Sequence, residues 1–246
     1  MLRHLFVIIT VFGLLACSDA SHDVNLQKQI SSDTSAKATA ILFADPQEID
    51  SSHIVIYPLL LEKTSYGNGS ASSRGGDRTS YWNLIFYNTD NNTQHLLTDD
   101  KKIVIYQFNL TSSSSSSSNG TWINGINIFE NNIFYSVVSR DFNENKYLDA
   151  DDPTYLYVSD KQGNNFRQLS PDDYNIVSWE VVAGTSKIIL QAQKDNNGDK
   201  KFDNNDQILP LVADVSTGKV GSETFNQTYI DSLKTVLLNI WKLDKK

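Results

Sequence analysis

Residues 133–169 read IFYSVVSRDFNENKYLDADDPTYLYVSDKQGNNFRQL, and this stretch decides the fold. Two runs rich in β-branched and aromatic residues, 133–139 and 155–158, flank a long polar loop. A tight turn at Gly163 then leads into a third run at 166–169. Such runs, bounded by Asn, Asp and Gly, are typical of β-strands joined in hairpins. The stretch therefore predicts three consecutive antiparallel strands with a long loop between the first two.

The same plan of strands and turns occurs three times, in copies at about 38–97, 102–169 and 176–225. Each copy has two strands around a polar loop, then a tight turn and another strand, with one more strand at its start. Repetition of this plan predicts an all-β domain over 38–246, built of three repeated four-stranded antiparallel sheets. The starting strands are predicted at 38–43, 122–129 and 179–182, and a separate strand is predicted at 102–110.

Two phrases of the middle copy, YLYVSD at 155–160 and FRQLSP at 166–171, resemble the blade pattern of TolB-like and WD40-like bacterial β-propellers. The resemblance covers roughly 38–225 and implies that each four-stranded unit is one blade. Closed propellers typically have about 4–8 blades, whereas this chain has three copies. The alternatives are an open arc of blades, closure by pairing with another copy, or a different fold made of three sheets. An open arc exposes sheet edges, which invite partner strands and homo-oligomers.

The end of the chain has a different period. Between 228 and 243, apolar residues recur at the spacing of one helix face, which predicts a C-terminal amphipathic helix. Thr228 and Asp231 resemble a capping box at its start, and lysines follow at its end. Such a helix is expected to pack its apolar face on something, with the open end of the sheet array as the candidate. The apolar positions are Tyr229, Ile230, Leu233, Val236, Leu237, Ile240 and Trp241.

The N-terminus has the features of an export signal. Residues 1–17 read MLRHLFVIITVFGLLAC, with Arg3 ahead of a short apolar run over 5–15. A helix needs about 20 apolar residues to span a bilayer, so this run is too short to be an anchor. A positive start followed by a short apolar run is typical of a cleaved signal peptide. We therefore expect residues 1–16 to be removed.

The end of this signal, LLAC at 14–17, resembles the lipobox of bacterial lipoproteins. The resemblance implies a diacylglyceryl group and a further acyl chain, such as palmitate, on Cys17, and two or more chains give stable membrane binding. In that family Ser18, in place of Asp, implies the outer membrane of a Gram-negative bacterium. The alternative is an ordinary secretory signal that happens to contain a cysteine. Residues 17–37 are mostly polar and predict a flexible lipidated tether in the periplasm or outside the cell.

Composition sets limits on the partners. Hydrophobic residues make up 39% of the chain, which is enough for a core, and the formal net charge is −8. Removing residues 1–16 removes one positive charge, Arg3, so the mature chain carries −8 − 1 = −9. This balance argues against nucleic acid as a partner and against electrostatic docking on anionic lipid, because both need basic patches.

Two polar loops, 141–152 and 195–206, share one pattern of oxygen-bearing side chains. Both place Asp or Asn at positions 1, 3, 5, 9 and 12. The pattern resembles the EF-hand calcium loop in its dockerin-type form, with a main-chain carbonyl at position 7. Calcium takes about 6–8 oxygen ligands on a sharply curved backbone. The predicted ligands are Asp141, Asn143, Asn145, the carbonyl of Tyr147, Asp149 and Asp152, and then Asp195, Asn197, Asp199, the carbonyl of Lys201, Asp203 and Asp206.

The loops depart from the calcium pattern at position 6, which is normally Gly. Here it is Lys146 or Lys200, where a left-handed backbone costs about 1 kcal/mol or more. The flanking segments are predicted strands and not helices, so the ion would have a structural role. The alternative is a pair of solvated Asx-turn loops without an ion. Two matches 195 − 141 = 54 residues apart, in the same slot of the repeat, favour calcium, while the first copy carries the Gly/Ser-rich 66–78 there.

Sequence patterns of catalysis are missing from the chain. It contains no H-E-x-x-H, G-x-S-x-G, P-loop or dinucleotide fingerprint, and its one cysteine is the predicted lipid site. Trp82, Trp122 and Trp179 lie in predicted strands, where core packing is the expected role. We therefore expect a non-catalytic envelope lipoprotein that binds or scaffolds another envelope protein. The alternative is a secreted hydrolase that acts on glycan or peptide.

Overall fold

The computed structural model describes residues 27, 40–49, 52–61, 79–109 and 131–241. The predicted signal peptide, Cys17 and the predicted strand at 122–129 lie outside these residues. In the described part of the chain the fold is all-β with one C-terminal helix, which confirms the predicted class. No helix among these residues is long and apolar enough to cross a membrane.

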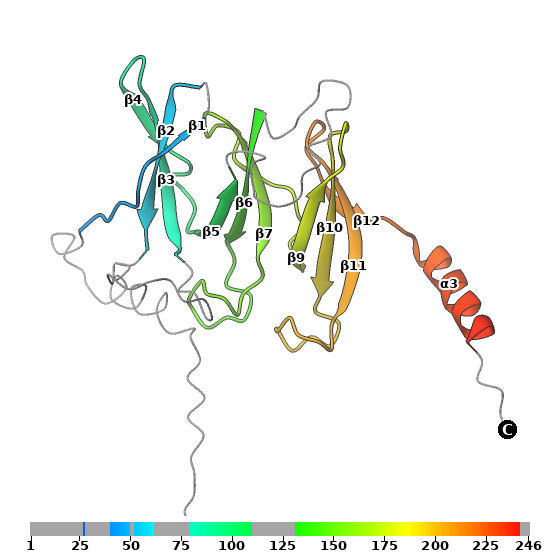
Figure 1. The fold of residues 1–246 in the computed structure, drawn as a ribbon. Helices are drawn as coiled ribbons and strands as arrows, with labels where there is room; N and C mark the ends of the chain where they lie inside the picture. Colours follow the sequence, from blue (N-terminus) through cyan, green and yellow to red (C-terminus); the bar gives the residue numbers. More distant parts are fainter. Residues whose placement is uncertain (1–26, 28–39, 50–51, 62–78, 110–130, 242–246) are drawn as a thin grey trace, which may run out of the picture.

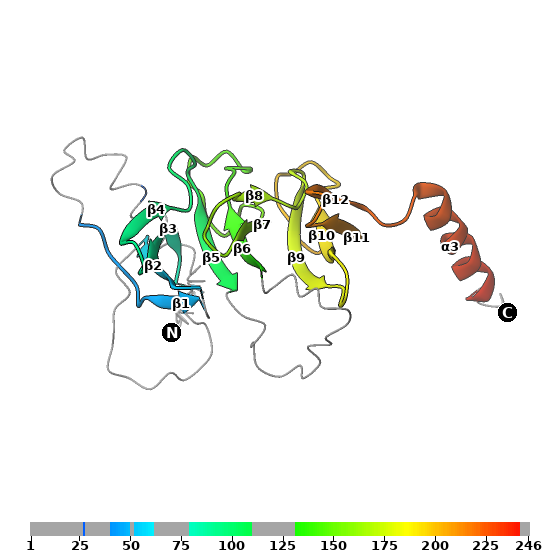
Figure 2. The same ribbon diagram turned by 90° about the horizontal axis from the view of Figure 1, so that it is seen from above.

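Three four-stranded antiparallel units follow one another along the chain, and Figure 2 shows them side by side. The first unit contains β1 (Gln47–Ile49), β2 (Ile54–Leu60), β3 (Tyr81–Asn88) and β4 (Thr93–Leu96). The second contains β5 (Val104–Asn109), β6 (Asn132–Val138), β7 (Tyr155–Asp160) and β8 (Arg167–Gln168). The third contains β9 (Tyr174–Val181), β10 (Lys187–Lys194), β11 (Gln207–Asp214) and β12 (Lys219–Glu223). Within each unit the strands pair in chain order.

The pairing differs from the prediction in two ways. Tyr81 of β3 pairs with Ile105 of β5, so hydrogen bonds join the first two units into one eight-stranded sheet, while the third unit is a separate sheet. The starting strands also differ. The second unit starts with β5, which corresponds to the separate strand predicted at 102–110. The sequence pattern placed this strand outside the four-stranded plan because residues 110–131 separate it from its partner β6. The first unit starts with β1, and among residues 40–43, the described part of the strand predicted at 38–43, only Phe43 forms a bridge, with Leu59.

The second unit is buried on both faces, which explains why β6 and β7 are continuous apolar runs. Successive side chains of a strand point to opposite faces. Ile133, Tyr135 and Val137 therefore pack in a cluster with the first unit, whereas Phe134 and Leu156 pack in a cluster with the third. Burying one such side chain contributes about 1.5–3 kcal/mol. The second unit thus holds the stack together from its centre.

An Asn or Asp ends the third strand of every unit and fixes the turn that follows. In each case its Oδ1 accepts the N–H of the residue two positions later, which is an Asx turn. The N–H of Asp90 donates to Asn88 at 2.9 Å, that of Gln162 donates to Asp160 at 3.0 Å, and that of Ser216 donates to Asp214 at 3.0 Å. This shared turn is evidence, independent of strand order, that the units follow one plan.

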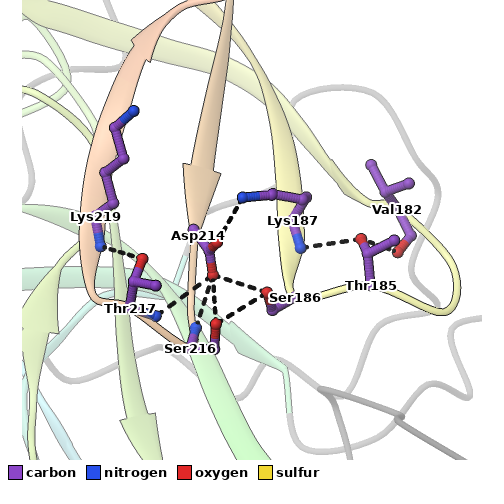
Figure 3. A network of polar contacts seen from close by, with 8 residues as sticks. All are labelled: Val182, Thr185, Ser186, Lys187, Asp214, Ser216, Thr217 and Lys219. Carbon is purple, nitrogen blue, oxygen red and sulfur yellow. Dashed lines mark hydrogen bonds and ion pairs between the residues drawn. The ribbon is translucent and has the colours of Figure 1, made fainter.

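Asp214 makes further contacts, which Figure 3 shows. Its Oδ1 also accepts the hydroxyls of Ser186 and Ser216, each at 2.8 Å, and its Oδ2 lies 2.5 Å from Nζ of Lys187. The residue is only 6% exposed. The Lys187 ammonium, followed by the two serine hydroxyls, holds the pKa of Asp214 well below its usual range. The carboxylate therefore connects the start of β10 with the turn after β11.

The helix α3 (Gln227–Ile240) stands apart from the sheets. None of its residues is buried, and Figure 1 shows it extending away from β12. The prediction that its apolar face packs on the sheet array is therefore wrong for the isolated chain. A period of 3.6 residues identifies an apolar face but carries no information about what covers it.

The predicted cap of this helix was also wrong. Asn226 is the N-cap, because its side-chain oxygen accepts the N–H of Tyr229 at 2.9 Å, in the role predicted for Thr228. Asn is among the residues most favoured at this position. Asp231 instead lies 3.1 Å from Nζ of Lys234 on the helix surface.

Candidate functional site

The two acidic loops occupy the same place in two successive units. Loop 141–152 joins β6 to β7 and loop 195–206 joins β10 to β11, and both lie at one end of the stack (Figure 1). The structure therefore places the two predicted ligand sets at equivalent positions, as the repeat implies. The corresponding segment of the first unit, 62–78, lies outside the described residues.

The two loops contact each other through charged and aromatic side chains. Nζ of Lys200 lies 2.6 Å from a carboxylate oxygen of Glu144, and the rings of Phe142 and Phe202 have centroids 5.1 Å apart. The ammonium lowers the pKa of Glu144. Because both charged side chains are largely exposed, this ion pair contributes little to stability. It does show that the loops are neighbours in space.

Both loops have a left-handed backbone at positions 4 and 6. In the first loop these are Glu144 and Lys146, with φ of 62° and 78°. In the second they are Gly198 and Lys200, with φ of 74° and 62°. A non-glycine residue adopts this conformation at a cost of about 1–2 kcal/mol, so the loop must stabilise it elsewhere. The left-handed lysine at position 6 is what the resemblance to the calcium loop requires.

The aspartate at position 1 stabilises this turn. The two carboxylate oxygens of Asp141 accept the N–H groups of Asn145 at 3.0 Å and Lys146 at 2.8 Å. In the second loop Asp195 accepts those of Gly198 at 2.7 Å and Lys200 at 3.0 Å. Hydrogen bonds to a charged acceptor contribute about 1.5–3 kcal/mol each when buried and less when exposed. They offset part of the strain at position 6.

The aspartate at position 12 closes each loop into a ring. Asp152 accepts the N–H of Phe142 at 2.8 Å and that of Asp149 at 3.1 Å. Asp206 does the same from positions 2 and 9 of its loop, at 3.0 Å each. Asp152 is 4% exposed, and burial raises its pKa although these N–H groups act in the opposite direction.

The remaining predicted ligand side chains form Asx turns. Each oxygen at positions 3, 5 and 9 accepts the N–H two residues later, as the alternative interpretation of these loops predicts. The first-loop pairs are Asn143 with Asn145 at 2.9 Å, Asn145 with Tyr147 at 2.8 Å and Asp149 with Asp151 at 3.0 Å. The second-loop pairs are Asn197 with Asp199 at 2.9 Å, Asp199 with Lys201 at 2.9 Å and Asp203 with Asn205 at 2.7 Å.

The donor set fits calcium in chemical type, because every predicted side-chain ligand offers oxygen and an oxygen that accepts one N–H keeps further acceptor capacity. Within the part of the chain that the structure describes, no group of three or more His, Cys, Asp or Glu side chains is placed to hold a metal ion. The Asx turns are thus present in the structure, and calcium binding stays a prediction.

A glutamine from the predicted tether contacts the first loop, and sequence analysis missed it. The side chain of Gln27 donates from Nε2 to the carbonyl oxygen of Leu148 at 2.7 Å and accepts the N–H of Leu148 at 3.0 Å. Gln27 is 8% exposed, and Leu148 is buried in a cluster with Leu61 and Val138. A pair of hydrogen bonds to a backbone 148 − 27 = 121 residues away has no local sequence signal.

Gln27→Ala is expected to lower the free energy of unfolding by about 1–3 kcal/mol, because it leaves a buried N–H and a buried carbonyl of Leu148 without this partner. Urea unfolding of the mature domain measures the loss, and hydrogen exchange should show faster exchange of the Leu148 amide. Gln27→Glu serves as the comparison, because it can still accept the N–H but cannot donate to the carbonyl. Unchanged exchange at Leu148 in Gln27→Ala would show that this contact does not persist in solution.

Trp82 and Trp179 pack against core clusters, as expected. Trp82 packs against the cluster that contains Leu148, and Trp179 packs against the cluster between the second and third units, 5.2 Å from the ring of Phe134. Trp122 lies outside the described residues.

Two histidines make contacts that the sequence did not predict. His53 Nδ1 lies 2.7 Å from a carboxylate oxygen of Asp90, which raises the pKa of the imidazole. The ring of His95 stacks on Phe86 with centroids 5.4 Å apart. Both contacts lie in the first unit, on the β3–β4 hairpin or beside it, far along the chain from the acidic loops. The contacts of both histidines, including that of His95 Nε2 with the carbonyl oxygen of Gln162 at 2.8 Å, are with residues outside the two acidic loops.

Comparison with known proteins leaves the family open: no family model matches the chain, and no curated protein matches it in sequence.

Proposed function

We propose that this chain is a non-catalytic envelope lipoprotein, attached by lipid on Cys17 to the outer membrane of a Gram-negative bacterium. Its three-unit β-domain binds or scaffolds another envelope protein. The observation that carries the proposal is the sequence LLAC at 14–17, at the end of a short apolar run. Calcium in the two acidic loops is part of the proposal and would supply positive charge among clustered carboxylates.

The open stack supports the binding role. On β10, Ile188 and Leu190 are buried against the second unit, whereas Ile189 between them faces the other way and is 45% exposed. In a closed propeller the next blade would cover that face. Ile208 on the neighbouring strand β11 is 51% exposed. An uncovered sheet with exposed aliphatic residues suits contact with a partner or with another copy.

Cys17→Ser is expected to abolish incorporation of radiolabelled palmitate and to move the protein from the membrane fraction to the soluble fraction. The reason is that one thiol carries the whole acyl anchor, and loss of two or more chains removes stable membrane binding. Labelling followed by fractionation of cell envelopes measures both effects.

Ser18→Ala is the matched control, since it changes the neighbouring residue and leaves the thiol, and it should retain label and location. Palmitate label that persists in Cys17→Ser would refute the anchor. Chemical crosslinking in intact cells tests the other half of the proposal: a wild-type protein that yields no adduct with any envelope protein would refute the scaffold role.

A further inference from the structure

The helix α3 presents an apolar face that no part of the described chain covers. At about 100° per residue, six of its seven exposed large apolar residues fall within an arc of about 140°, and Leu238 lies outside that arc. They are 44–75% exposed, although side chains of this size are usually buried in soluble proteins. The residues are Tyr229, Leu233, Val236, Leu237, Ile240 and Trp241.

Apart from Leu238, the rest of the helix surface is polar, and the C-terminal segment is locally basic. Thr235 and Asn239 lie on the side away from the apolar face. Residues 227–246 contain four lysines and two aspartates, so the segment carries +4 − 2 = +2 in a chain of net charge −8. Three of those lysines follow Trp241, which is 75% exposed at the end of the helix. An apolar face, a terminal tryptophan and basic residues together suit the headgroup region of a lipid bilayer.

The length of α3 determines how it could meet a bilayer. Its 14 residues extend about 21 Å at 1.5 Å per residue, which is shorter than the ~30 Å hydrocarbon core. It is also not apolar on all sides. A helix of this kind lies in the plane of the interface, with its apolar face toward the acyl chains.

The proposed lipid anchor on Cys17 would hold the domain close to a membrane surface. Gln27 is fixed to Leu148 in the first acidic loop, and only 27 − 17 = 10 residues separate it from Cys17. At about 3.6 Å per residue, the lipidated cysteine lies at most about 36 Å from that loop. Figure 1 shows α3 running from β12 toward the same end of the stack.

We propose that α3 is a second membrane attachment, which lies in the headgroup region of the phospholipid surface that holds the lipid on Cys17. This rests on the proposed lipid anchor. The two acidic loops lie at the same end of the stack as α3 (Figure 1), so their negative charge opposes attachment to anionic lipid. Burial of the apolar face of α3 therefore drives the attachment, and the surface that this face contacts is one of neutral phospholipid.

The test uses the full mature chain as Cys17→Ser, so that no acyl chain contributes, with vesicles of phosphatidylcholine and phosphatidylethanolamine. Val236→Asp with Ile240→Asp places two charges on the apolar face. Thr235→Asp with Asn239→Asp places the same charges at the same spacing on the polar side, and neither pair alters a buried residue. Flotation with vesicles should show binding of the parent and of the polar-side variant, and binding at least about tenfold weaker for the apolar-face variant.

Several outcomes would overturn the proposal. Absence of vesicle binding by the parent, or equal loss in both variants, would do so. A dimer that the apolar-face variant disperses in light scattering would assign the face to a second copy. A lower melting temperature of the apolar-face variant without lipid would assign it to this chain's own sheets. Because the parent has no Cys17 thiol, these results are independent of palmitate labelling, which alone decides the proposed anchor.

Discussion

Asp214→Ala is expected to lower the free energy of unfolding by about 2–4 kcal/mol, because it removes several hydrogen bonds of a buried carboxylate together. The Lys187 ammonium and the hydroxyls of Ser186 and Ser216 lose a common acceptor, and the start of β10 loses its connection to the turn after β11. Urea unfolding at neutral pH measures the loss. Asp214→Asn keeps an oxygen for the N–H of Ser216 and should cost less.

The same carboxylate gives a dependence on pH whose sign follows from its lowered pKa. A carboxyl whose pKa is lower in the folded chain stabilises the fold fully above its unfolded pKa of about 3.9, and this stabilisation is lost as the pH falls through the folded value. The stability difference between wild type and Asp214→Asn should therefore narrow below about pH 4. Equal stability of wild type and Asp214→Asn at neutral pH would contradict a stabilising role of the network. A stability difference that does not change with pH would show that the charge of Asp214 is not the source of the difference.

Much of the fold could be predicted from the sequence, because the central strands are buried on two sides. A strand covered on both faces must be apolar at nearly every position, so 133–138 and 155–158 have a strong signal. The hairpins could be predicted because Gly163 and the Asn and Asp residues at the strand ends have local preferences for turns. The close approach of Gly163 to Phe86, where a Cβ would lie 2.5 Å from the ring, has no such signal.

The features that were missed depend on contacts between distant parts of the chain. β5 pairs with β6 although residues 110–131 lie between them in the sequence, and a pairing across that separation has no signal in local composition. Packing of α3 on the sheets was predicted because an apolar face needs a cover, and the described part of the chain does not supply one. Gln27 is one polar residue among many in its segment, and only the structure connects it to Leu148.

For the acidic loops, the residues and the backbone were predictable and the side-chain directions were not. The spacing of oxygens is written in the sequence, and Lys146 and Lys200 adopt the left-handed turn that the spacing requires. A carboxylate can accept N–H groups or bind an ion, and composition does not decide between these uses. In the structure Asp141 and Asp195 accept N–H groups of their own loops.

Calcium at millimolar concentration is expected to raise the melting temperature of the mature domain, and magnesium should raise it less. An ion that binds only the folded state stabilises it by about 2.7 kcal/mol per site at a hundredfold excess over the dissociation constant. Lysine at position 6 and asparagine ligands suggest weak sites, near the ~10⁻⁴–10⁻³ M of extracellular modules. Magnesium demands stricter octahedral geometry and gives up its water reluctantly, so it suits this ring of loosely held oxygens less well.

The shift in melting temperature caused by calcium, and not the absolute stability, distinguishes loops that bind calcium from loops that only form Asx turns. Asp141→Ala with Asp195→Ala removes both position-1 oxygens and should abolish the shift, although it also weakens the ion-free loops by removing acceptors of Lys146 and Lys200. Glu144→Ala with Asp151→Ala removes two acids of the first loop that are not predicted ligands, so it should retain the shift. A wild-type melting curve that is the same in chelator and in excess calcium would leave the carboxylates as acceptors of backbone N–H groups alone. A shift lost equally in both variants would show that calcium acts through net charge, because clustered carboxylates repel one another whether or not an ion sits at a defined site.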